Sequence, residues 1–189
     1  MTMSSAYHNP VLLRESVDGL QIKEDGVYVD VTFGGGGHSK EILKRLGSGG
    51  KLFAFDQDED ALQNTLNDER FQLINQNFRY LKQFLKFYGI RKVDGILADF
   101  GVSSHQFDEA ERGFSIRFNA DLDMRMDKNN ELSAFQVVNT YSQEDLASVL
   151  FQYGELRNAN AMAKTIVEAR AEEPIKTTDD LKGVLKRFL

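Results

Sequence analysis

Short apolar runs alternate with stretches of helical periodicity over the first half of the chain. Runs rich in β-branched and aromatic residues are typical of buried strands. Four such runs occur, at residues 27–31, 51–56, 71–74 and 93–99. Apolar residues at helical spacing predict helices between them, at 39–46, 60–66 and 80–88. Strands that alternate with helices predict βαβ units, a parallel sheet and right-handed crossovers. The expected fold class is therefore α/β, with a Rossmann-like core.

The pattern changes after residue 104, because no further strand candidate of comparable quality follows. Ser142 with Asp145 resembles a capping box at the start of a helix, and a threonine at 177–178 is expected to cap the last one. We therefore predict a Rossmann-like core over residues 1–104 and a mainly helical inserted or substrate-binding unit over 105–189.

A parallel sheet of only four strands leaves an edge and an apolar face uncovered. The chain ends at Phe188 and Leu189 without supplying further strands, which suggests a polypeptide that is shortened at its C-terminus. The alternative is a compact four-stranded domain whose helical half covers the exposed face.

The amino-acid composition excludes several classes of protein and of functional site. The chain has 189 residues, of which 41% are hydrophobic and 28% charged, so one domain with an appendage is expected. The absence of cysteine excludes disulfides, thiolate metal sites and a cysteine nucleophile. No apolar run approaches the length of a membrane span, so a cytoplasmic protein without membrane contact is expected. A net charge of −6 argues against an extended basic surface, although a local basic patch stays compatible with nucleic-acid binding.

Four consecutive glycines, Gly34 to Gly37, stand between the first predicted strand and the following helix. Glycine is needed where the backbone takes positive φ or where a ligand approaches it closely. A flexible loop is the alternative. Gly34 and Gly36 supply the start of a dinucleotide motif, but Ser39 stands where its third glycine is expected. A nucleoside ligand without a pyrophosphate therefore fits better.

Asp56 ends the second predicted strand, about 20 residues after the glycines, where an acid in such folds accepts hydrogen bonds from ribose hydroxyls. An aspartate at a strand end is also a common helix N-cap, the role expected for Asp58. The glycines and Asp56 together imply an adenosine-like cofactor.

Polar residues also follow the fourth predicted strand, among them Asp99, His105 and Gln106. Open α/β sheets place their sites at this carboxyl edge. A Ser-His-Asp hydrolase is disfavoured because the GxSxG turn is absent. An ordinary loop is the remaining alternative, since serine, aspartate and glutamine are common in turns.

Several motifs in order resemble the RsmH (MraW) family, whose members use S-adenosyl-L-methionine to methylate N4 of a cytidine in bacterial 16S ribosomal RNA. The resemblance runs from Tyr7 to the end of the chain. The motifs that carry it are His8-x-Pro10-Val11-Leu12-Leu13-x-Glu15, Gly36-Gly37-His38-Ser39, Asp99-x-Gly101-Val102-Ser103-Ser104-x-Gln106, Leu122-Asp123-Met124-Arg125-Met126-Asp127 and Tyr153-Gly154-Glu155.

The resemblance implies a class I methyltransferase core interrupted by a helical domain. It also implies S-adenosyl-L-methionine as cofactor, with the ribose held by Asp56, and no metal is expected. The implied cofactor contacts are Gly36, Gly37, His38, Asp56, Phe78, Asp99 and Gln106. Asp99 is a candidate catalytic acceptor for the target amine, and a purely cofactor-contacting Asp99 is the alternative.

The implied partner is small-subunit ribosomal RNA or the 30S particle. Arg112 and Arg125, together with Arg117, are candidate phosphate ligands, and ion pairing with nearby aspartates is the alternative. Family members continue beyond this length, so a fragment that binds cofactor or a ribosomal partner without turnover is the alternative function. The sequence leaves the oligomeric state open, a homodimer included.

Overall fold

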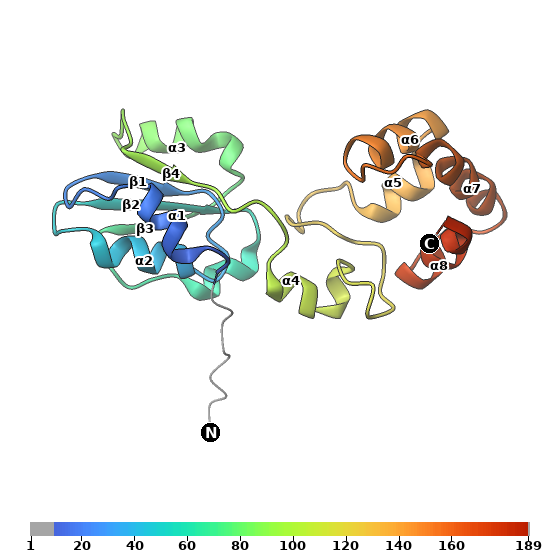
Figure 1. Cartoon of the computed structure of the whole chain (residues 1–189), viewed down its shortest axis with the longest axis horizontal. Helices are drawn as coiled ribbons and strands as arrows, with labels where there is room; N and C mark the ends of the chain where they lie inside the picture. Colours follow the sequence, from blue (N-terminus) through green and yellow to red (C-terminus); the bar gives the residue numbers. More distant parts are fainter. Residues whose placement is uncertain (1–9, 189) are drawn as a thin grey trace, which may run out of the picture. The chain divides into compact units, whose positions relative to one another are not determined.

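The computed structural model describes residues 10–188, so His8 lies outside the described residues. The chain divides into two compact units, and the boundary in the sequence lies between Gly101 and Val102 (Figure 1). Each unit is described by itself.

The first unit contains a parallel four-stranded sheet with strand order β3-β2-β1-β4. Its strands are β1 (Val27–Asp30), β2 (Lys51–Asp56), β3 (Phe71–Asn75) and β4 (Gly95–Leu97). All four predicted strands are therefore confirmed, and so is the α/β class. The fourth strand is shorter than predicted.

Three α-helices accompany this sheet: α1 (Leu13–Gly19), α2 (Gly37–Arg45) and α3 (Leu81–Phe87). The helix predicted at 60–66 is instead the 3₁₀ helix η1 (Glu59–Asn64), and the 3₁₀ helix η2 (Phe78–Tyr80) precedes α3. Asp58 caps η1 as predicted, because its side chain accepts a hydrogen bond from the Asp60 N–H. The last turn of η1 closes through a bond from the Thr65 N–H to the Leu62 carbonyl, which is 3₁₀ spacing.

Successive side chains of a strand point to opposite faces of the sheet, and each face here has its own apolar cluster. Tyr28 and Leu52 pack with residues of α1 and α2. Val29, Phe53 and Phe55 pack with Leu85 of α3 and its neighbours. Figure 1 shows α2 and α3 on opposite sides of the sheet. Both faces of the central strands are therefore covered.

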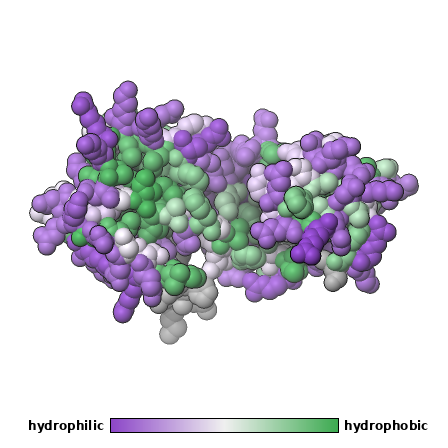
Figure 2. Space-filling model, turned by 45° about the horizontal axis from the view of Figure 1, so that its top comes forward, coloured by the Kyte–Doolittle hydropathy of each residue, from purple (hydrophilic) through white to green (hydrophobic). Residues whose placement is uncertain are grey.

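The outer edge of β4 has no strand partner among residues 10–188, because β4 pairs only with β1. Ile96 on this strand is 48% exposed. A pocket of about 310 Å³ lies between α1 and β4, lined in part by Leu12, Leu20 and Ile96. Figure 2 shows apolar side chains gathered on one face of this unit.

The second unit is helical. Its helices are α4 (Ser104–Asp108), the 3₁₀ helix η3 (Ala110–Arg112), α5 (Ala134–Thr140), α6 (Gln143–Gln152), α7 (Ala159–Glu172), α8 (Thr178–Leu185) and the 3₁₀ helix η4 (Lys186–Phe188). The predicted caps are confirmed, since Ser142 and Thr177 accept hydrogen bonds from the Asp145 and Asp180 N–H groups.

The core of the second unit consists of apolar side chains from α5, α6, α7 and α8, together with Leu122 and Ile175 from the connecting segments. The described part of this unit forms no strand. An isolated antiparallel β-bridge joins Asp121 to Thr177. Across residues 10–188, no helix combines the length and apolar character needed to cross a bilayer.

Arg70, directly before β3, connects the start of that strand to the end of α2 and is held by an ion pair with Asp68. Arg70 donates to both carboxylate oxygens of Asp68 and to the Leu46 carbonyl at 2.6 Å. The Arg70 guanidinium lowers the pKa of Asp68 to about 2. Because this pKa is lower in the folded protein, the stabilisation is complete above the ordinary aspartate pKa of 3.8 and is lost as pH falls towards 2.

We expect Asp68→Asn to lower the free energy of unfolding near neutral pH by about 1 kcal/mol or less, since partly exposed pairs contribute little. The difference from the unmodified chain should disappear as pH falls towards 2, as measured by thermal unfolding at several pH values. Glu69→Gln, at the exposed neighbouring position, is the control. A stability difference for Asp68→Asn that does not depend on pH would contradict this assignment.

Candidate functional site

The glycine loop joins β1 to α2, and its glycines are required for different reasons. Gly34 and Gly36 have φ values of +50° and +73°, which residues with a Cβ rarely adopt. A Cβ on Gly36 would lie 2.9 Å from the Phe33 ring, and one on Gly37 would lie 2.3 Å from Cγ of Pro10. A Cβ on Gly34 would meet no atom within 4 Å. The space beside Gly34 is therefore open, whereas a side chain at Gly36 or Gly37 would collide with neighbouring residues.

The first turn of α2 supplies donors beside this loop. Gly36 is its N-cap, and no side chain caps the helix, so the first N–H groups are left for other acceptors. His38 in this turn is 5% exposed, and within residues 10–188 its Nε2 atom has no hydrogen-bond partner. A buried ring nitrogen without a partner fits a loop that receives a polar ligand.

Asp56 at the end of β2 is bound to the glycine loop. Its Oδ2 accepts a hydrogen bond from the Gly34 N–H at 2.8 Å, and its Oδ1 accepts one from the Asp58 N–H at 2.9 Å. Burial raises the pKa of Asp56, and these two N–H donors oppose that increase. Each carboxylate oxygen has two lone pairs, so acceptor capacity is left for a pair of hydroxyls.

Phe78 and Phe100 bring together segments that follow the two outermost strands. Phe78 begins η2 after β3, and Phe100 follows β4. Their ring centroids are 5.6 Å apart, although β3 and β4 lie at opposite ends of the sheet. The two rings therefore meet across the carboxyl edge of the central strands. They are 42% and 71% exposed.

Sequence reasoning missed Phe100. Its available signal was an aromatic residue directly after a predicted strand, in a segment otherwise made of small and polar residues.

Asp99 lies at the same edge, one residue before Phe100. Its N–H donates to Oγ1 of Thr32 at 2.8 Å, and Thr32 lies between β1 and the glycine loop. The residue is exposed, and its carboxylate has no hydrogen-bond partner in the described part of the chain. The first unit therefore brings Asp99, Asp56 and the glycine loop to one edge of the sheet.

Gln106 belongs to the second unit and is 6% exposed. Its Oε1 accepts a hydrogen bond from the Ser103 N–H at 3.0 Å, while Oγ of Ser103 accepts one from the Gln106 N–H at 3.2 Å. The two residues form the capping box of α4. The structure thus explains Gln106 as a cap, and its cofactor contact stays a prediction.

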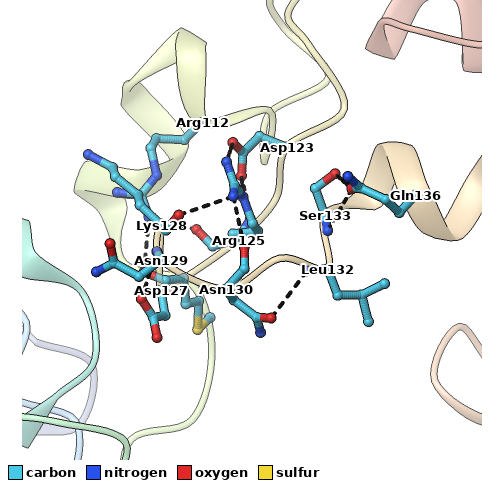
Figure 3. A network of polar contacts seen from close by, with 11 residues as sticks. Arg112, Asp123, Arg125, Asp127, Lys128, Asn129, Asn130, Leu132, Ser133 and Gln136 are labelled. Atoms are coloured by element: carbon cyan, nitrogen blue, oxygen red, sulfur yellow. Dashed lines mark hydrogen bonds and ion pairs between the residues drawn. The ribbon is translucent and has the colours of Figure 1, made fainter.

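The candidate phosphate ligands Arg112 and Arg125 form a network within the second unit (Figure 3). Arg125 donates to both carboxylate oxygens of Asp123, at 2.9 and 2.7 Å, and also to the carbonyls of Lys128 and Asn130. The buried Arg112 donates to the Arg125 carbonyl at 2.9 Å. Both guanidiniums therefore hold the loop at 123–130 in shape.

Ion pairing, the alternative interpretation of these arginines, is observed for Arg125 and Arg117. Arg125 pairs with Asp123 and lowers the pKa of that carboxyl group. Arg117 pairs with Asp108 on the surface, where the two side chains are 63% and 71% exposed. Contact of any of these arginines with phosphate stays a prediction.

The parallel sheet, the glycine loop after its first strand and the acid after its second strand define a Rossmann-like α/β protein. The chain belongs to the MraW methylase family, whose sequence profile matches residues 5–189.

Three relatives are each named Ribosomal RNA small subunit methyltransferase H. The protein from Flavobacterium johnsoniae is 69% identical over 189 residues, and that from Christiangramia forsetii is 64% identical over 189 residues; both alignments cover 100% of this chain. The protein from Bacteroides thetaiotaomicron is 56% identical over 180 residues, which are 95% of this chain. The chain spans 63%, 63% and 59% of the lengths of these relatives.

We expect Arg125→Lys to lower the free energy of unfolding, because the single ammonium nitrogen of a lysine cannot occupy the separate positions from which Nε, Nη1 and Nη2 donate to Asp123, Lys128 and Asn130. Thermal unfolding of the whole chain measures this change. Arg117→Lys, at the exposed pair with Asp108, is the matched control and should change stability by about 0.5 kcal/mol or less. Equal effects of the two substitutions would show that the Arg125 network does not stabilise the loop.

Proposed function

We propose that this chain carries the cofactor-binding core and the helical unit of an enzyme that transfers a methyl group from S-adenosyl-L-methionine to N4 of a cytidine in 16S ribosomal RNA. The family and the names of the relatives support ribosomal RNA methylation. The observation that carries the cofactor assignment is the Asp56 carboxylate, which is tied to the Gly34 N–H and retains acceptor capacity beside the glycine loop.

The residues of the first unit fit such a cofactor. Asp56 would accept hydrogen bonds from the ribose hydroxyls, as acids at this position do in related folds. The first turn of α2, with Gly36, Gly37 and His38, supplies donors for the polar part of the cofactor. Phe78 presents a partly exposed ring for contact with the adenine. Gln106, at the start of the second unit, is proposed as a further contact.

S-adenosyl-L-methionine supplies a methyl group on a sulfonium, which needs no activation by the protein. The cytidine amine is a poor nucleophile, because its lone pair is conjugated into the ring. A carboxylate that accepts a hydrogen bond from the amine favours localisation of that lone pair and orients the nitrogen. The exposed Asp99 carboxylate, at the edge shared with Asp56, is proposed for this role.

The proposed substrate is a base in the small-subunit RNA or in the 30S particle. A paired base must leave its stack before it reaches such a site. The helical unit is proposed to contact this RNA through the ordered loop at 123–130, whose shape the candidate phosphate ligands Arg112 and Arg125 maintain. A protein with this substrate acts in the cytoplasm, where ribosomal subunits are assembled.

Binding of S-adenosyl-L-methionine to the chain tests the cofactor site. We expect Asp56→Asn to weaken binding at least about tenfold in isothermal titration, because the amide removes a charge and an acceptor while preserving shape. Asp94→Asn is the matched control, since Asp94 also accepts a backbone N–H, from Val27, but lies at the amino end of its strand. Unchanged affinity in Asp56→Asn, or no binding by the folded chain, would overturn the assignment.

Methyl transfer tests the role of Asp99. We expect Asp99→Ala to abolish formation of N4-methylcytidine in small-subunit particles, measured by mass spectrometry of the nucleosides, while S-adenosyl-L-methionine still binds. Asp94→Asn serves again as control and should transfer normally. Loss of cofactor binding in Asp99→Ala would favour a cofactor contact over an amine contact. Absence of transfer by a chain that binds the cofactor would favour the alternative function, a fragment that binds cofactor without turnover.

A further inference from the structure

Asp30, the last residue of β1, is a fully buried carboxylate that accepts three hydrogen bonds. Its side chain is 0% exposed. Oδ2 accepts a hydrogen bond from Oγ of Ser39 at 2.7 Å, and Oδ1 accepts from the Thr32 N–H at 3.0 Å and from Oγ1 of Thr32 at 3.4 Å. A buried carboxylate is tolerated only with such donors. Asp30 therefore orders Ser39 in α2 and Thr32 before the glycine loop.

The Thr32 hydroxyl is oriented by its hydrogen bond to Oδ1 of Asp30, which is 3.4 Å from Oγ1. A hydroxyl has one donor hydrogen and two lone pairs. Because the hydrogen of Thr32 points to Asp30, a lone pair is available to the Asp99 N–H, 2.8 Å from Oγ1. The β-branched side chain of threonine also restricts rotation about χ1. The hydroxyl thus connects the buried carboxylate to the main chain of Asp99.

The main chain of β1 does not hold Asp99 by itself. Its last bond to the β4 side runs from the Val31 N–H to the Leu97 carbonyl at 2.9 Å. Beyond that point the chain turns towards β2, where the Phe33 N–H donates to the Phe55 carbonyl at 3.0 Å. The Thr32 side chain therefore continues the link to the β4 side after the backbone ladder has ended.

We infer that Thr32 is the positioning residue of Asp99. Its hydroxyl, oriented by Asp30, fixes the Asp99 backbone at the carboxyl edge and couples it to the glycine loop and α2. Neither Thr32 nor Asp30 contacts the reacting atoms in this assignment. The importance of Thr32 for methyl transfer rests on the proposed function, whereas its hold on Asp99 does not.

Two substitutions of Thr32 distinguish the effect of its hydroxyl from the effect of its branched shape. Thr32→Val keeps the branched shape and removes the hydroxyl, and Thr32→Ser keeps the hydroxyl. Hydrogen exchange of the Asp99 amide, followed by NMR on the whole chain, reports the bond directly. Amides of β2 provide the internal reference, and thermal unfolding confirms that both variants fold.

We expect Thr32→Val to speed exchange of the Asp99 amide at least about fivefold, the equivalent of one ordinary hydrogen bond, while β2 amides are unchanged. Thr32→Ser should keep the original rate. In a methyl-transfer assay, Thr32→Val should lower kcat at least about fivefold and leave the affinity for S-adenosyl-L-methionine within about twofold, with rescue by Thr32→Ser.

Unchanged Asp99 exchange in Thr32→Val would overturn the inference, and so would equally fast exchange in both variants. If the unmodified chain neither binds S-adenosyl-L-methionine nor transfers methyl groups, the proposed function fails, and the exchange rates still decide whether Thr32 holds Asp99. If transfer occurs and kcat is the same in Thr32→Val, the positioning role in catalysis is wrong.

Discussion

Parallel pairing of β1 with β2 on one side and β4 on the other is the constraint on which the first unit depends. It brings the carboxyl ends of three strands to one edge, and each strand is followed or ended by an aspartate. These acids differ in environment. Asp30 is buried and bound by three donors, Asp56 is partly buried and bound by two, and Asp99 is exposed. The exposure of these carboxylates to solvent increases in that order, so Asp30 is limited to a structural role, whereas Asp56 and Asp99 are accessible for the roles proposed above.

The second unit uses its charges differently. Arg112 and Arg125 donate to backbone carbonyls, and Arg125 also pairs with Asp123, so these cations order a loop that has no regular secondary structure. A guanidinium suits this task because its donors are arranged in a rigid fork. These two arginines therefore stabilise the folded loop. Under the proposed function, the RNA would contact the surface of that ordered loop.

Much of the fold follows from local sequence patterns. The four strands, the caps at Asp58, Ser142 and Thr177, and the glycine loop are all visible in short stretches, because periodicity, capping and positive φ are local properties. The contacts that build the edge are not local. The bond between Thr32 and Asp99 and the contact between Phe78 and Phe100 join residues far apart in sequence, so no spacing rule indicates them.

The open edge of β4 has a consequence for the behaviour of the chain in solution. Within residues 10–188, the outer edge of β4 beside the exposed Ile96 has no strand partner, and the N–H and C=O groups of such an edge can pair with an extended segment. A segment on the same polypeptide has an effective concentration in the millimolar range, whereas a second molecule reaches that level only in concentrated samples. Self-association of the isolated chain should therefore increase steeply with concentration, and the three-residue length of β4 keeps each such pairing weak.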